Sequence, residues 1–147
     1  MPYSNGIVYE FPHGLPGFEE EKRFLLIEAP HGGPLVFLQS MRQASLCFVA
    51  FPIRILDESY ELAVAPEDLE ELGLDSTRQP DPGAEVMVLA LLSLDGKAMP
   101  SANLMAPVVL NLKTRRGLQA IRRDSRYSHQ YSLGARTLDR RATEEAC

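Results

Sequence analysis

Hydrophobic residues are gathered into short runs along the chain, and turn residues separate these runs. Runs of strand length occupy residues 7–11, 24–27, 35–38, 47–51, 84–94 and 107–112. They are rich in leucine, β-branched and aromatic side chains and are bounded mostly by Pro, Gly and Asp, which is typical of β-strands. Apolar and polar residues alternate over residues 60–64, and this period of two predicts a further, half-buried strand.

One helix is predicted to begin at Pro66. Proline suits the first helical position, and the acidic residues Glu67 and Asp68 lie where the helix dipole is positive. Gly73 then ends the helix. Residues 118–121 fit either a strand or the start of a helix, because periodicity alone does not distinguish the two in so short a run.

Glycine and proline punctuate the chain densely, as at residues 13–18 and 80–83. Many short strands at close spacing, without a regular alternation of strand and helix, predict a small, mostly antiparallel β-barrel-like or sandwich domain with one or two short helices. The length of 147 residues suits one domain, which we place at residues 1–133. Residues 134–147 lack apolar periodicity, so we expect a mobile, polar C-terminal tail there.

The apolar runs also bear on where the protein is found. The longest uninterrupted apolar stretch, residues 86–92, is far shorter than the roughly 20 residues of a membrane-spanning helix. The first residues, Met-Pro-Tyr-Ser-Asn-Gly, have neither the basic start nor the apolar stretch of a secretory signal. We therefore expect a cytoplasmic protein that does not associate with a membrane.

Charge is distributed unevenly between the two parts of the chain. Residues 1–112 hold 16 of the 20 acidic residues but only 6 of the 15 basic ones, whereas residues 113–147 hold 9 basic and 4 acidic residues. An acidic body attracts basic partners and repels nucleic-acid phosphates, so no direct nucleic-acid contact is expected. The basic segment 113–126 leaves one alternative open, an RNA-associated β domain in which Tyr127 and Tyr131 stack on bases.

No arrangement of residues predicts catalysis. The three histidines and two cysteines lack the spacing of a metal site, and no glycine motif for binding phosphate is present. The carboxylates at residues 19–21 are typical of a solvated turn. Cys47 lies in an apolar run, where a thiol reacts poorly, so a hydrolase built on it is a distant alternative. We expect a non-enzymatic protein without a metal or cofactor.

Several motifs point to one known family when they are taken together. Residues 7–19 read Ile-Val-Tyr-Glu-Phe-Pro-His-Gly-Leu-Pro-Gly-Phe-Glu, and further matches follow in order at residues 37–40, at residues 103–111, and at Gly117, Gln119 and Tyr127. In these motifs the chain resembles the flagellar assembly factor FliW family. The resemblance covers residues 7–133, nearly the whole chain, and the family's barrel-like β architecture agrees with the strands expected from the apolar runs.

The resemblance implies a cytoplasmic, monomeric regulator that binds newly made flagellin. When free of flagellin, such a protein binds and antagonises the translational regulator CsrA. Flagellin that accumulates in the cytoplasm then sequesters the regulator and frees CsrA to repress flagellin translation. The family pattern does not choose between a groove for an amphipathic helix and the addition of a strand to a sheet edge as the mode of binding.

The resemblance and the local sequence together give a set of candidate partner-binding residues. They are Phe18, Glu19, Gln39, Ser40, Asn103, Asn111, Gln119 and Tyr127. The neighbouring Gly14, Pro16 and Gly17 are typical of a turn that needs glycine conformations. The two asparagines also suit a purely local role, because turn asparagines commonly bond the nearby backbone. The sequence leaves open which of these side chains point outward.

Overall fold

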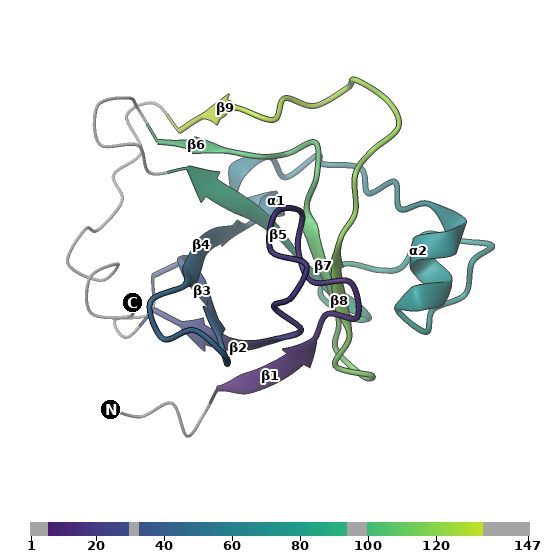
Figure 1. Ribbon diagram of the computed structural model, residues 1–147. Helices are drawn as coiled ribbons and strands as arrows, with labels where there is room; N and C mark the ends of the chain where they lie inside the picture. The colour runs from purple at the N-terminus through teal and green to yellow at the C-terminus, as the bar shows by residue number, and fades with distance from the viewer. Residues whose placement is uncertain (1–5, 30–32, 94–99, 134–147) are drawn as a thin grey trace.

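The protein is described here from a computed structural model, which describes residues 6–29, 33–93 and 100–133. Its strands form a nearly closed, barrel-like antiparallel sheet (Figure 1). The strands are β1 (Ile7–Glu10), β2 (Arg23–Glu28), β3 (Val36–Ser40), β4 (Cys47–Pro52), β5 (Val86–Ser93), β6 (Ser101–Ala102), β7 (Val108–Asn111), β8 (Gly117–Gln119) and β9 (Tyr131–Ser132). The helices are α1 (Ile53–Leu56) and α2 (Pro66–Glu71). This architecture confirms the predicted fold class.

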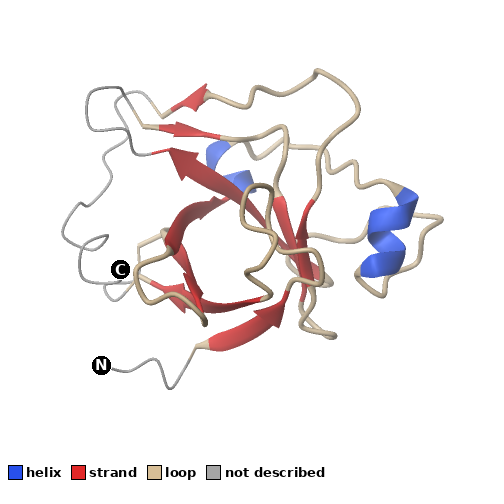
Figure 2. Ribbon diagram, viewed as in Figure 1, coloured by secondary structure: helices blue, strands red, loops and turns tan. Residues whose placement is uncertain are grey.

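The ring of strands follows the order of the chain from β1 to β5 and then branches. Strand β5 pairs with β7 along its first half and with β6 at its end, while β8 pairs with β7 and β9 with β6. The ring closes where β1 meets the start of β8. There the backbone N–H of Glu10 donates to the carbonyl of Arg115 at 2.8 Å, and Glu10 forms a parallel bridge with Arg116. Figure 2 shows the ring in red, with α2 outside it.

Both faces of the sheet are buried, which explains why the strands appear in the sequence as continuous apolar runs. One cluster takes side chains from β1, β2, β3, β4, β5 and β7, so it fills the inside of the barrel. Val36 and Leu38 belong to it, whereas Phe37 between them packs in a second cluster outside the barrel. The second cluster lies beneath the two helices and the long loops.

The predicted strand at residues 60–64 is wrong, although its alternation is real. Tyr60 and Val64 are buried and Glu61 is exposed, as a half-buried strand requires. Among the described residues no strand pairs with this segment, and side chains bind its backbone instead. The Gln79 amide binds both the N–H and the C=O of Val64, at 2.8 and 3.0 Å, and the Tyr127 hydroxyl accepts from the N–H of Glu61 at 3.1 Å.

The remaining helices and strands are short, and the sequence predicted only some of them. Helix α2 is confirmed, and Gly73 follows it with a φ of +78°. Residues 118–121, left open by the sequence, contribute to strand β8. Helix α1 and the two-residue strands β6 and β9 are too short to leave a periodic pattern. The expected tail at residues 134–147 lies outside the described residues. Within the described ranges, no helix is long and apolar enough to cross a membrane.

Candidate functional site

The loop at residues 11–22 joins β1 to β2 and covers one end of the barrel. Phe11 and Leu15 are buried in the cluster inside the barrel, so the loop closes that end. Figure 1 shows it as a dark purple trace across the ring of strands. Phe18, at the outer side of the same loop, leaves 39% of its surface exposed. The loop therefore combines a buried plug with an exposed aromatic side chain.

The backbone of this loop is held in one conformation. Leu15 and Phe18 exchange backbone hydrogen bonds of 3.3 and 2.7 Å. Gly14 has a φ of +63°, and a β-carbon placed on it would lie 2.5 Å from the carbonyl oxygen of Phe18. Only glycine fits there, both for its backbone conformation and for the close approach. The turn predicted from the glycines is confirmed.

Glu19 fixes the tip of the loop through its own side chain. Its carboxylate accepts a hydrogen bond of 2.9 Å from the backbone N–H of Gly17, which has a φ of +85°. This hydrogen bond is the main reason that the pKa of Glu19 lies below its usual value. Glu19 thus stabilises the turn that presents Phe18 and still adds a negative charge beside it.

Phe18 is the outermost ring in a row of phenylalanines that runs out from the core. Its ring meets Phe48 edge to face at 5.1 Å between centroids, Phe48 meets Phe24 at 5.8 Å, and Phe24 meets Phe11 at 5.1 Å. Edge-to-face contacts of this kind are favourable beyond the area they bury. The Phe18 ring is therefore anchored on one side and open on the other.

Glu21 connects this loop to the loop at residues 41–46, between β3 and β4. Its side chain is only 2% exposed, and both carboxylate oxygens accept hydrogen bonds. The donors are the Ser40 hydroxyl at 2.5 Å, the Gln43 amide at 2.7 Å, and the Arg42 guanidinium at 2.6 and 3.0 Å. These contacts, with Ser40 as the largest cause, hold the pKa of Glu21 below its usual value.

The loop at residues 41–46 is also organised from its base. The side-chain amide nitrogen of Gln39 lies 3.1–3.2 Å from four carbonyl oxygens, those of Ser40, Gln43, Ala44 and Leu46. The Ser40 hydroxyl oxygen accepts from the backbone N–H groups of the second and third residues after it, at 3.1 and 2.9 Å. These two candidate residues, at the end of β3, therefore use their polar groups to shape the loop that follows them.

The structure thus brings four of the eight candidate residues to two adjoining loops: Phe18, Glu19, Gln39 and Ser40. The exposed side chains on these loops form what we call the Phe18 surface, defined as Phe18, Glu19, Glu20, Met41 and Arg42. The Glu20 side chain is 86% exposed, and Met41 is 48% exposed. An exposed aromatic and an exposed methionine among charged groups suit the binding of a protein.

Three other candidates lie elsewhere and bond the backbone. The buried Asn111 amide donates to the carbonyl of Leu72 at 2.7 Å. The Gln119 amide donates to the carbonyl of Ala106 at 2.9 Å. The side-chain oxygen of Asn103 accepts from the backbone N–H groups two and three residues further on, both at 3.0 Å. Each of these side chains holds a turn or a loop in place.

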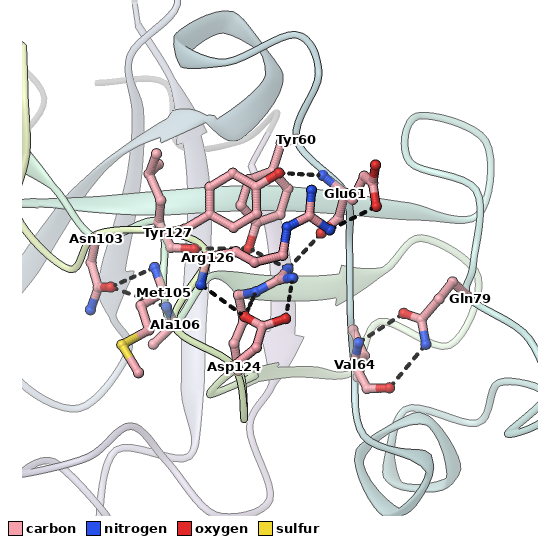
Figure 3. A network of polar contacts seen from close by, with 12 residues as sticks. Tyr60, Glu61, Val64, Gln79, Asn103, Met105, Ala106, Asp124, Arg126 and Tyr127 are labelled. Atoms are coloured by element: carbon pink, nitrogen blue, oxygen red, sulfur yellow. Dashed lines mark hydrogen bonds and ion pairs between the residues drawn. The ribbon is translucent and has the colours of Figure 1, made fainter.

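The last candidate, Tyr127, belongs to a network around a buried cation (Figure 3). Arg122 is only 3% exposed and lies over the rings of Tyr60 and Tyr127, with its guanidinium carbon 5.4 and 4.7 Å from their centroids. It binds the Asp124 carboxylate at 2.8 and 2.9 Å and the carbonyl of Glu61 at 2.5 Å. Sequence reasoning counted Arg122 among the surface cations, and only its neighbour two residues on, Asp124, hinted at a partner.

Three of the six cations in the basic segment 113–126 contact carboxylates within the fold. Besides Arg122, Arg123 forms an ion pair with Glu67, and Arg126 binds Glu61 at 2.9 Å. Cations that contact carboxylates within the fold are less available to nucleic-acid phosphates. This arrangement weighs against the RNA-associated alternative.

The histidines, Cys47 and the carboxylates are the side chains that could serve metal or nucleophile chemistry. Across the described ranges, no group of three His, Cys, Asp or Glu side chains is placed to hold a metal ion. His13 contacts the Glu71 carboxylate at 2.9 Å on the surface. Cys47 lies half-buried at the first position of β4.

Comparison with known proteins agrees with the sequence motifs. The family model described as FliW protein matches residues 2–133. A flagellar assembly factor FliW from Azoarcus sp. (strain BH72) is 40% identical over 125 residues, which are 80% of this chain and 82% of that protein. The protein of the same name from Bacillus subtilis (strain 168) is 30% identical over 84% of this chain and 83% of its own length.

A solved structure extends the likeness to three dimensions. The crystal structure of the flagellar assembly factor FliW matches with a TM-score of 0.74 and 29% sequence identity, over 89% of this chain and 88% of that one. The family model, the sequence relatives and the solved structure agree with one another. The chain belongs to the FliW family.

Proposed function

We propose that this protein is a non-enzymatic flagellar assembly factor that works in the cytoplasm as a monomer. It binds flagellin and, when free of flagellin, binds and antagonises the translational regulator CsrA. Membership of the FliW family supports the flagellar role, since relatives of this chain are named flagellar assembly factors. Because the two partners compete, flagellin that accumulates in the cell releases CsrA, and the coupling between the two sites is reciprocal.

The observation that carries the proposal is the presentation of Phe18. Its ring is 39% exposed on a loop fixed by the Gly14 turn and the Glu19 contact, and Phe48 supports it from below. A rigid aromatic side chain that loses little conformational freedom on binding is the usual anchor of a protein–protein interface. We assign flagellin to this surface.

Charge supports the second partner. Acidic side chains fill four of the six positions of α2, namely Glu67, Asp68, Glu70 and Glu71. Burial and the neighbouring Glu67 and Glu71 raise the pKa of Asp68, as expected where negative charges crowd together. An RNA-binding protein such as CsrA carries basic surfaces, and a negative field steers such a partner into contact.

Calorimetric titration with flagellin and with CsrA from the same organism tests the proposal. Each partner is added alone and then in competition at physiological salt, and we expect flagellin to displace CsrA. Phe18→Ala should weaken flagellin binding at least tenfold, or about 1.4 kcal/mol. Ile55→Ala is the matched control, because Ile55 is an exposed apolar side chain on α1, at 55% exposure, outside the Phe18 surface.

Each outcome of these titrations is informative. Binding of flagellin without CsrA leaves an assembly role and removes the translational one. A wild-type protein that binds neither partner overturns the proposal. If Phe18→Ala and Ile55→Ala bind flagellin equally well, the partner uses another face.

A further inference from the structure

The Phe18 surface is built from two loops that come from distant parts of the chain. Phe18 and Glu19 lie between β1 and β2, whereas Met41 and Arg42 lie between β3 and β4. One backbone hydrogen bond, from the N–H of Met41 to the carbonyl of Arg23 at 3.0 Å, ties the second loop to the sheet. Two carboxylates of the first loop reach the second: Glu20, which is 86% exposed and lies 3.5 Å from Arg42, and Glu21, which is buried and contacts Ser40, Arg42 and Gln43.

The side chains around Glu21 all direct hydrogen-bond donors at its two carboxylate oxygens. The Ser40 hydroxyl oxygen already accepts from the backbone N–H groups of Arg42 and Gln43, so its own hydrogen is left for the Glu21 carboxylate. The guanidinium of Arg42 is a donor at every nitrogen, and the Gln43 group that faces Glu21 is its NH₂. Every neighbour of this carboxylate is therefore a donor.

Burial makes this link strong. Hydrogen bonds to an ionised group are shorter and stronger than those between neutral groups, and here the contacts range from 2.5 to 3.0 Å around a side chain that is 2% exposed. Without the carboxylate, Gln43 would lose its contact with the first loop, and Arg42 would keep only its exposed ion pair with Glu20, at 3.5 Å. The loop would then be held by its base, by the backbone contact to Arg23 and by this exposed ion pair.

We propose that Glu21 is the positioning residue of the Phe18 surface, which holds the loop at residues 41–46 against the Phe18 loop so that a protein partner meets both as one preformed site. This inference rests on the proposed function for the identity of the partner. Preformation matters when the partner binds only molecules in which the two loops are ordered together. Its apparent dissociation constant is then the intrinsic one divided by the fraction of molecules in that ordered state.

The variant Glu21→Gln tests this role with almost no change of shape. Its amide would direct an NH₂ group at neighbours that are all donors, so the hydrogen bonds to the oxygen that the NH₂ replaces are lost. We expect faster hydrogen exchange at the backbone N–H groups of Arg42 and Gln43, which report the loop directly through their bonds to Ser40. We also expect flagellin to bind about tenfold more weakly if the ordered loop falls to about a tenth of the population.

Two further variants make the test specific. Glu21→Gln combined with Gln43→Glu restores the net charge and places at residue 43 a carboxylate that can accept from both the new amide and Arg42. It should therefore recover part of the slow exchange and part of the affinity. Glu85→Gln is the matched control, since it breaks a similar two-point contact with Arg78, at 2.7 and 2.8 Å, in a loop away from the Phe18 surface. It should leave exchange at residues 41–46 and flagellin affinity unchanged.

The two readouts separate this inference from the function on which it rests. If wild-type protein does not bind flagellin, the proposed function fails, while the exchange measurement still decides whether Glu21 orders the loop. If Glu21→Gln lowers unfolding stability but leaves exchange at Arg42 and Gln43 and flagellin affinity at wild-type values, Glu21 is only structural and the inference is overturned. The inference is also overturned if the double variant, Glu21→Gln with Gln43→Glu, recovers neither the slow hydrogen exchange nor the flagellin affinity.

Discussion

The guanidinium of Arg122 lies over the ring of Tyr127, with its central carbon 4.7 Å from the ring centroid. The same guanidinium lies over the ring of Tyr60 at 5.4 Å and so joins the segment after β8 to the segment around Tyr60. The Tyr60 hydroxyl donates to the carbonyl of Leu104 at 2.8 Å and lies 3.3 Å from Arg122. Asp124 neutralises the buried cation through two hydrogen bonds and raises its pKa, so Arg122 stays charged. Arg122 thus helps to hold residues 120–130, which have no regular secondary structure, to the rest of the fold.

Replacement of Arg122 by methionine should destabilise the protein by about 2 kcal/mol. The apolar side chain fills similar space but leaves the carbonyl of Glu61 and the carboxylate of Asp124 without their donor. Urea denaturation measures the change in the free energy of unfolding. Lys113→Met, which also removes one positive charge but at an exposed position, should change stability by about 0.5 kcal/mol or less. Equal effects would show that charge, rather than the network, matters.

Gly14 and Gly17 should respond differently to alanine, although both have positive φ angles. At Gly14 a β-carbon would meet the Phe18 carbonyl oxygen at 2.5 Å, whereas at Gly17 no atom lies within 4 Å. We expect Gly17→Ala to cost about 1 kcal/mol from backbone strain alone and Gly14→Ala at least about 2 kcal/mol, because the clash adds to the strain. Thermal and urea unfolding of the two variants give the comparison, and equal losses would contradict the close approach.

The ion pair of Arg78 and Glu85 should make stability depend on pH in acid. Contacts with Arg78 and with the backbone N–H of Asp81 lower the pKa of Glu85 from 4.5 to about 2. Because the pKa is lower in the folded state, the stabilisation is complete above pH 4.5 and is lost as the pH falls toward 2.

Urea midpoints measured from neutral pH down to about pH 2 test this dependence. In Glu85→Gln the decrease in stability with acid should be smaller than in wild type, since one of the titrating carboxyl groups is gone. Parallel curves for the two proteins would show that Glu85 does not contribute.

The protein should not bind single-stranded RNA measurably at low salt, where electrostatic binding is strongest. Arg122 is buried, and Arg123 and Arg126 contact carboxylates of the body. Fluorescence anisotropy with a labelled oligonucleotide is the measurement. Binding that disappears in the double variant Arg115→Ala with Arg116→Ala would revive the RNA-associated alternative.

The apolar pattern was sufficient to predict most of the sheet. Strands β3, β5 and β7 are buried on both faces over most of their length, so runs such as residues 84–94 stand out regardless of register, and glycine and proline mark the turns between them. The requirement for glycine at Gly14 is likewise local. Residues 60–64 show the limit of such patterns, because alternation reports burial and not whether a neighbouring strand completes the ladder.

By itself, the sequence determined the class of fold, the positions of the main strands and the turn that presents Phe18, because these depend on the burial and conformational preferences of adjacent residues. Only the tertiary structure decided which polar side chains are internal. Glu21 looked like one of three solvated carboxylates and Arg122 like a surface cation, yet both are buried against partners distant in the chain, Ser40 and Tyr60. A charged side chain becomes buried only where folding supplies its complement, and that complement is set by contacts between residues far apart in the chain.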